Sequence, residues 1–186
     1  MVFVPKSSRG QFKEDGMPLL HTCRNQHGSE LAGEYRYGDA GQATVACLFF
    51  VFWITDIFFE YSTFLNQYIP SGIRIPVGII LLIFASYLAV TGLYTVFGKK
   101  RAEPVVIREG AFRIIRHPIY LSEIMLYLGL LILSISLAAL VIWIIGIVFL
   151  HYISRHEEKL LIARFGEEYK KYMRDVPMWI PLLRRK

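Results

Sequence analysis

The sequence predicts an all-α integral membrane protein with four transmembrane helices, the last two forming a helical hairpin, and a C-terminal amphipathic helix. Hydrophobic residues make up 54% of the 186 residues. The mean hydropathy of +0.41 is too high for an ordinary soluble protein, so the membrane is the expected solvent. We expect a cytoplasmic N-terminal arm over residues 1–42 and one membrane domain over residues 43–186.

The predicted arm has scattered glycine, serine and charged residues without a clear period, which indicates a mostly irregular segment. It does not start with a basic region followed by an apolar core, so we expect no cleaved signal peptide. His21, Cys23 and His27 are soft metal ligands close together in sequence. In a tail that also contains glycine and glutamine such side chains are usually solvated, and we expect no metal site.

Apolar runs define the four predicted spans. A hydrocarbon core of about 30 Å takes roughly 20 helical residues, and the first two runs are long enough to cross it. The last two runs are shorter and together favour a hairpin that turns at Ser134 and Ser136. The spans are predicted over residues 43–65, 73–97, 118–134 and 137–153.

The C-terminal amphipathic helix is predicted over residues 156–173. Apolar residues recur there among charged ones with a helical period, which is typical of a helix that lies on the membrane or packs over a site.

Basic residues predict the orientation in the membrane. All Lys and Arg except Arg74 lie before the first span, between the second and third, or after the fourth. Four spans place these regions on one side, so both termini are expected in the cytoplasm by the positive-inside rule. We attribute the net charge of +6 to this topology and to attraction to anionic membrane lipids. Interleaved Asp and Glu argue against a nucleic-acid partner.

Charged residues flank the predicted hairpin in the sequence. Pro118 suits the first position of a helix, so Arg116 and His117 are expected where free N–H groups and the positive helix dipole attract an anion. Glu157 and Glu158 follow the second apolar run and face the same place if the two helices are antiparallel. They suit a cationic or hydroxyl-bearing group.

These motifs resemble those of the isoprenylcysteine carboxyl methyltransferase family and its relatives, the phospholipid N-methyltransferases. The matching pieces are VIREGAFRIIRHPIY from Val106, the pair Glu157 and Glu158, FGEEYKKY from Phe165, and VPMWIP from Val176. They occur in the family's order and spacing. The resemblance implies a membrane methyltransferase domain over residues 43–186.

The resemblance further implies S-adenosylmethionine as the methyl donor, held at the cytoplasmic face. His117 and Tyr120 are then expected to contact the cofactor, and the glutamate pair to bind its ammonium group or ribose hydroxyls. The cofactor's carboxylate suits a helix N-terminus flanked by Arg113 and Arg116. The candidate cofactor-binding residues are Gly110, Arg113, His117, Tyr120, Glu157 and Glu158.

Arg116 and Glu123 are the candidate catalytic residues. A lipophilic acceptor is expected to enter from the bilayer, and the sequence leaves open a prenylated cysteine carboxylate, a phospholipid amine and a small thiol or other lipid. An ammonium group must lose a proton before it attacks. Glu123, about one turn past Pro118 among apolar neighbours, is the best-placed general base.

Two other functions are compatible with parts of the pattern. The order RHPxY and then FGxxYxxY also resembles NADPH-dependent sterol and steroid reductases. These usually have Asn at the position of Ile119, which argues against a reductase, and an acidic residue shortly afterwards, as Glu123 is here, which argues for one. Adjacent Glu157 and Glu158 and the small size favour the methyltransferase. A non-catalytic membrane module that uses these charges as helix-end anchors is the third alternative. The oligomeric state is left open.

Overall fold

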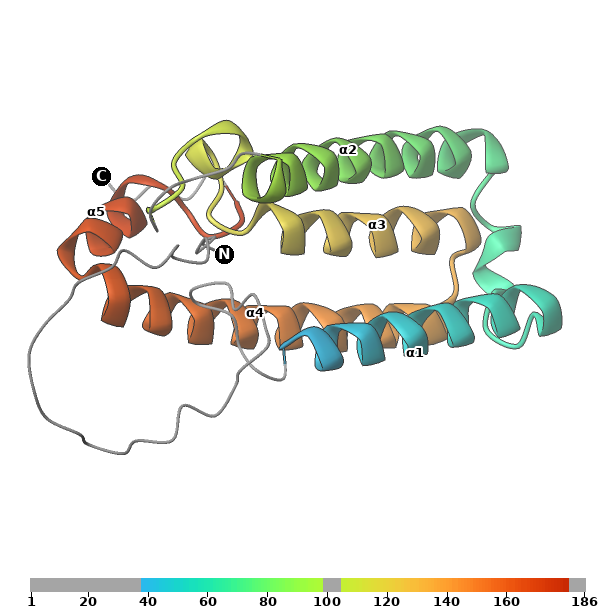
Figure 1. Cartoon of the computed structure of the whole chain (residues 1–186). Helices are drawn as coiled ribbons and strands as arrows, with labels where there is room; N and C mark the ends of the chain where they lie inside the picture. The colour runs from blue at the N-terminus through green and yellow to red at the C-terminus, as the bar shows by residue number, and fades with distance from the viewer. Residues whose placement is uncertain (1–37, 99–104, 181–186) are drawn as a thin grey trace, which may run out of the picture.

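The chain is described by a computed structural model that covers residues 38–98 and 105–180. All regular elements in these ranges are helices, and the four longest run side by side, with α5 across one end (Figure 1). Residues 1–37 of the predicted arm, with His21, Cys23 and His27, for which no metal site was expected, lie outside the described residues. The elements are α1 (Gly38–Phe59), η1 (Phe64–Gln67), α2 (Ser71–Phe97), η2 (Gly110–Arg113), α3 (Pro118–Ser134), α4 (Leu137–Phe165) and α5 (Glu167–Asp175).

The lengths of the helices and their exposed apolar side chains are typical of a membrane protein. Within the described ranges, α1, α2 and α4 are long and apolar enough to cross a membrane, whereas α3 is an apolar helix of 17 residues. Large apolar side chains such as Phe58, Ile80 and Val148 are exposed, as expected for a surface that faces lipid. The structure therefore supports a multi-pass membrane protein with three helices of spanning length and one shorter helix in the described part.

The first span was predicted about five residues too late. The structure starts α1 at Gly38 and ends it at Phe59, whereas the predicted span covered residues 43–65. The chain turns sharply at Glu60, which has φ +52°. Asp56 stabilises this turn because its carboxylate accepts the Ser62 N–H at 2.7 Å and also the Ser62 hydroxyl.

The C-terminal helix is divided differently from the prediction. The expected helix over residues 156–173 is wrong as one unit, because α4 runs without a break to Phe165 and α5 begins at Glu167. Neither Gly nor Pro interrupts the chain near residue 156, and the break comes at Gly166, which has φ +55°. α5 buries Tyr169 and Tyr172 and exposes its charged residues.

Packing divides the four long helices into two pairs. α3 packs most extensively against α2, and α1 packs against α4, so the α3–α4 hairpin is open along part of its length (Figure 1). Gly78 and Gly129 let α2 and α3 approach closely, since a Cβ on either one would lie 3.2 Å from the other's carbonyl oxygen. Phe49 of α1 and Tyr127 of α3 stack with ring centroids 4.4 Å apart and join the pairs.

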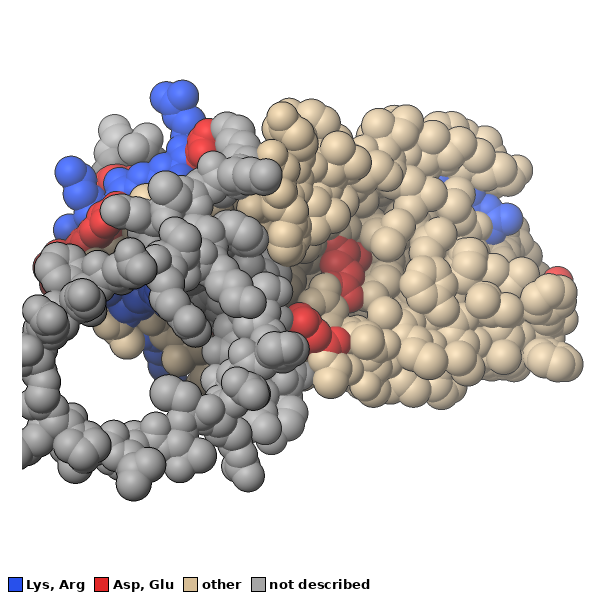
Figure 2. Space-filling view, in the orientation of Figure 1, with Lys and Arg blue, Asp and Glu red and all other residues tan. Residues whose placement is uncertain are grey.

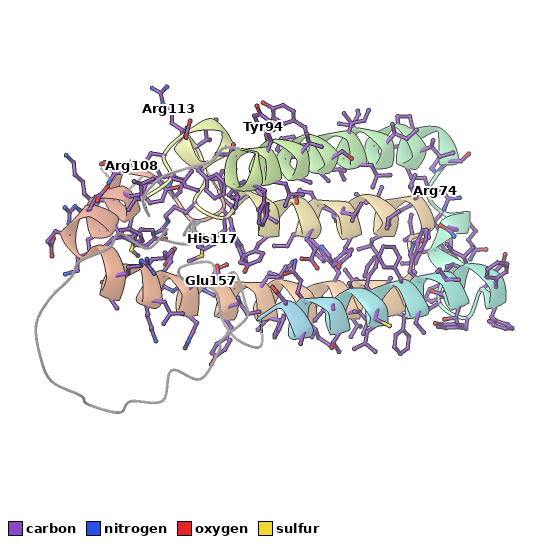
Figure 3. The ribbon with its side chains drawn as sticks, viewed as in Figure 1. Arg74, Tyr94, Arg108, Arg113, His117 and Glu157 are labelled. Carbon is purple, nitrogen blue, oxygen red and sulfur yellow. The ribbon has the colours of Figure 1, made fainter. Side chains whose placement is uncertain are left out.

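Charged residues concentrate at the α5 end of the bundle. Lys and Arg gather there, whereas most of the rest of the face in view carries neither sign of charge (Figure 2). Arg74 lies at the opposite end (Figure 3). The orientation of these two ends relative to the cytoplasm stays a prediction.

Candidate functional site

The candidate site lies where the start of α3 faces the extended end of α4. Pro118 occupies the first turn of α3 and His117 is its N-cap residue. Because α4 continues beyond residue 153, it carries Glu157 and Glu158 to the level of this N-terminus. His117 and Glu157 point toward each other between the two helices (Figure 3).

Five of the predicted site residues form one connected cluster. Arg116 Nη1 and His117 Nε2 lie 3.1 Å and 3.3 Å from Glu158 Oε1. His117 Nδ1 lies 3.7 Å from Glu157 Oε2, and the Tyr120 hydroxyl donates to Glu157 Oε1 at 2.5 Å. The rings of His117 and Tyr120 stack with centroids 5.6 Å apart.

The cluster is buried and carries a net negative charge. Arg116, His117, Glu157 and Glu158 are each at most 9% exposed. Burial lowers the pKa of His117 below 6.5 and outweighs the hydrogen bond to Glu158, which acts in the opposite direction. With His117 neutral, two carboxylates face one buried guanidinium. Arg155 approaches from the surface, with its side chain 60% exposed and its Nη1 3.9 Å from Glu158 Oε2.

Three buried atoms of the cluster make no hydrogen bond among the described residues, and they are Arg116 Nε, Arg116 Nη1 and Glu158 Oε2. Arg116 Nη1 still lies 3.1 Å from Glu158 Oε1 as an ion pair, and Glu158 Oε2 has the longer contact with Arg155. An unpaired buried polar atom is costly, and a ligand with matching groups would pair these atoms. The cluster thus offers a donor for an anionic group and an acceptor for a cationic one.

A small pocket beside the cluster includes residues that the sequence analysis missed. Asp39 and Gln42 line it from the first turns of α1, in a segment that was predicted to belong to the arm. The signal was present as a carboxylate and an amide three residues apart, immediately before the apolar run. The pocket has a volume of about 50 Å³ and is lined by Asp39, Gln42, Phe112, Arg116, His117, Pro118, Ile119, Tyr120 and Glu157.

A second, larger pocket adjoins the first on the side of α2. It shares Gln42 and Ile119 with the small pocket and has a volume of about 250 Å³. Glu123 lines it and accepts hydrogen bonds from the Tyr127 hydroxyl at 2.6 Å and from the Gln42 amide. Ser86, on the exposed side of α2, marks its opening. Acidic side chains are visible in a recess of this otherwise apolar face (Figure 2).

Two predicted cofactor-binding residues lie outside both pockets. Arg113 is exposed at the end of η2 and points away from the bundle (Figure 3). Gly110 has φ +57° and forms the turn that starts η2, where an added Cβ would lie 2.8 Å from Thr95 Oγ1. The structure therefore gives Gly110 a role in the loop and does not bring Arg113 to the cluster.

The C-terminal segment pairs with the backbone just before α3. The N–H groups of Arg116 and His117 donate to the carbonyls of Pro177 and Met178 at 3.0 Å and 3.3 Å. The sequence analysis missed this pairing, which fixes the backbone of the RHP motif. The anion site expected at the start of α3 involves the first N–H groups of that helix and stays a prediction.

α5 holds the same loop from the other side. The Tyr172 hydroxyl donates to the Phe112 carbonyl at 2.6 Å, and burial raises the pKa of Tyr172, which keeps this donor protonated. Arg108 Nη2 donates to the Glu168 carbonyl at 2.7 Å, and its guanidinium lies 5.5 Å from the centre of the Tyr172 ring.

We expect the buried imidazole to make the fold sensitive to acid. Because the pKa of His117 is lowered in the folded chain, the unfolded chain takes up a proton below pH 6.5 that the folded chain does not. The contribution of His117 to the free energy of unfolding is therefore fully present above pH 6.5. It falls as the pH drops below that value, by at most about 1.4 kcal/mol per pH unit. Thermal unfolding in detergent between pH 7.5 and 5.5 should show a smaller pH slope for His117→Gln. Identical slopes would contradict the assignment.

Comparison with known proteins identifies the family. The family model described as phospholipid methyltransferase matches residues 72–168, just over half of the chain. A methanethiol S-methyltransferase of Crocosphaera subtropica is 32% identical over 95 residues, which cover 50% of this chain and 36% of that protein. One of Pseudomonas deceptionensis is 30% identical over 115 residues, which cover 56% of this chain and 42% of that protein. The matches thus span about two fifths of the length of these relatives.

A solved structure shares the fold. The structure of a eukaryotic intramembrane Ras methyltransferase, isoprenylcysteine carboxyl methyltransferase, matches with a TM-score of 0.58 and 21% identity. The match covers 78% of this chain and 53% of the other. The resemblance seen in the sequence motifs is therefore confirmed, and the chain belongs to the phospholipid methyltransferase family of integral membrane methyltransferases.

Proposed function

We propose that the chain transfers a methyl group from S-adenosylmethionine to an amine on a lipophilic molecule. The observation that carries the donor assignment is the buried cluster in which Glu157 and Glu158 face one guanidinium and a neutral imidazole. S-Adenosylmethionine supplies an electrophilic methyl group on a sulfonium, which is a permanent cation. A cluster with a net negative charge attracts such a cation, and the family membership supports methyl transfer.

The residues present suit the chemical groups of the donor. The unpartnered Arg116 Nε suits its carboxylate, and the carboxylates of Asp39 and Glu157 in the small pocket suit its ammonium group or ribose hydroxyls. The unpartnered oxygen of Glu158 adds a further acceptor. Since a volume of about 50 Å³ holds only a few waters, donor binding requires the lining of the pocket to open.

The larger pocket suits an amine better than a carboxylate. Glu123 is the charged residue among its described lining residues, so a carboxylate acceptor would meet a like charge without a counterion. Ser86 and Ser122 donate their hydroxyl protons to backbone carbonyls of their own helices, which leaves oxygen lone pairs for the ligand. The Gln42 amide is already bound to Glu123. The pocket therefore offers mainly acceptors, and these match the N–H groups of an amine.

Glu123 is proposed to hold the proton that the amine must release. Glu123 would accept the N–H proton that a protonated amine must lose before its nitrogen can attack a methyl carbon. The sulfonium of S-adenosylmethionine would supply that methyl group and keep the electrons of the broken carbon–sulfur bond. Gln42 and Tyr127 fix the carboxylate beside the shared wall of the two pockets. Arg116 acts here by holding the donor, and its earlier assignment as catalytic stays a prediction.

The alternative functions have less support. Family membership favours methyl transfer over NADPH-dependent reduction, and the continuous buried cluster favours a binding site over a module with separate helix-end anchors. We place the site at the cytoplasmic face because the basic end of the bundle lies beside it.

The first test of this proposal is binding of the donor. We expect purified chain in detergent to bind S-adenosylmethionine in calorimetry and to show no stabilisation by NADPH. Glu157→Gln removes a charge-assisted interaction worth about 1.5 to 3 kcal/mol, so affinity should fall by about tenfold to a hundredfold. Glu167→Gln is the matched control, since Glu167 is exposed on α5 and pairs with Lys170 of the same helix.

Three results of this binding test would contradict the donor assignment. Stabilisation by NADPH alone would favour the reductase, and no binding of either ligand would favour the non-catalytic module. Equal affinity in Glu157→Gln and Glu167→Gln would remove the glutamate pair from the donor site.

The second test concerns the acceptor. With labelled S-adenosylmethionine, we expect methylation of a long-chain amine lipid and little methylation of a prenylcysteine carboxylate. Glu123→Gln should lower the rate by about 100-fold or more, as for loss of a general base, without changing donor affinity. Glu60→Gln, at the opposite end of the bundle, is the control. Product formed only from the carboxylate or from a small soluble thiol, or an undiminished rate in Glu123→Gln, would overturn the acceptor assignment.

A further inference from the structure

A third cavity lies at the end of the bundle opposite the candidate site. It is bounded by η1, the start of α2 and the turn between α3 and α4, and it has a volume of about 340 Å³. This size falls in the range of about 300 to 1,000 Å³ that is usual for ligand pockets. Apolar side chains such as Leu65, Ile69, Val77 and Leu140 line it, and Ile73 at its edge is 62% exposed. The cavity therefore opens toward lipid and suits a hydrocarbon chain.

Arg74 is the charged residue among the side chains that line this cavity, and part of its guanidinium lacks a hydrogen bond among the described residues. It is the exception to the placement of basic residues, since every other Lys and Arg lies in the segments predicted to be cytoplasmic. Its Nη1 donates to the neutral amide oxygen of Asn66, and its Nε is buried without a partner among the described residues. The ion pairs of the described ranges do not include Arg74. A partly buried guanidinium without a counterion is unfavourable in a membrane.

The helix that carries Arg74 adds a second source of positive potential. Arg74 lies in the first turn of α2, whose N-cap residue Pro70 provides no side-chain cap. The N-terminus of a helix of 27 residues favours negative charge nearby. Guanidinium and helix end thus attract an anion at the position where the apolar cavity begins.

We propose that this cavity binds one anionic phospholipid, with its phosphate on Arg74 and one acyl chain between α2 and the α3–α4 turn. A guanidinium fork matches phosphate oxygens and satisfies the unpartnered Nε. The apolar lining along Ile73 and Val77 receives the chain that leaves the headgroup. The inference goes beyond the proposed methyl transfer, because this lipid lies at the far end of the bundle and is neither donor nor acceptor.

The test compares two lipids that differ only in headgroup. Full-length chain in detergent is photolabelled with phosphatidylglycerol or phosphatidylcholine that carries a diazirine in the same acyl chain, and labelled peptides are mapped. We expect phosphatidylglycerol to label residues 65–77 and 131–140 about tenfold more than phosphatidylcholine, as for a charge-assisted contact. Arg74→Gln should remove this preference and Arg74→Lys should retain part of it. Lys171→Gln, exposed on α5, should leave labelling of these peptides unchanged.

A second variant tests the cavity separately from the charge. Val77→Trp fills the groove from its lipid-facing side and should lower labelling by phosphatidylglycerol while Arg74 remains in place. Equal labelling by the two lipids, or labelling that neither Arg74→Gln nor Val77→Trp reduces, would show ordinary surrounding lipid and overturn the proposal.

Discussion

The buried ion pair between Arg116 and Glu158 is the interaction on which the rest of this structure depends. It joins the start of α3 to the end of α4 at 3.1 Å, with both side chains removed from water. Burying two charges costs several kcal/mol per ion unless their geometry and hydrogen bonds compensate. Here the compensation is incomplete, because Arg116 Nε and Glu158 Oε2 make no hydrogen bond within the described residues. Such a cluster is unfavourable for stability alone, which supports the binding role proposed for it.

The surrounding elements hold this pair in place. α4 must continue without a break to Phe165 so that its glutamates reach the start of α3. The C-terminal segment and α5 then fix the loop before α3, through the backbone bonds of Arg116 and His117 and through the hydroxyl of Tyr172. Helix packing at the far end, by contrast, depends on turns and small residues. These contacts fix the charged side of the candidate site, whereas the pocket that Glu123 lines is bordered by exposed, lipid-facing surface.

The sequence predicted the parts of the site that follow from local pattern. Spacing of the apolar runs and antiparallel helices were enough to expect that His117 and Glu157 face each other, and the structure brings them together. The early start of α1 was not predictable in this way, because Gly38–Gln42 is not apolar and its helix is part of a contact in which Gly41 lies directly against Phe149.

Other differences arose from contacts between residues distant in sequence. Pairing of the Arg116 and His117 N–H groups with the carbonyls of Pro177 and Met178 has no signal in either segment alone. Arg113 points outward from the end of η2, a short helix that begins at Gly110 with its φ of +57°. Patterns of charge locate candidate residues, whereas their directions depend on such turns and on tertiary contacts.

A double-mutant cycle on Arg116 and Glu158 tests the central claim most directly. Arg116→Met, Glu158→Met and the double variant are compared by free energy of unfolding in detergent and by affinity for S-adenosylmethionine. The account predicts that each single variant loses about 3 to 5 kcal/mol, because it leaves a buried charge unpaired, and that the double variant recovers most of this loss without recovering donor binding. Additive losses of stability, or native donor affinity in the double variant, would contradict the claim that the pair is a coupled buried unit kept for binding.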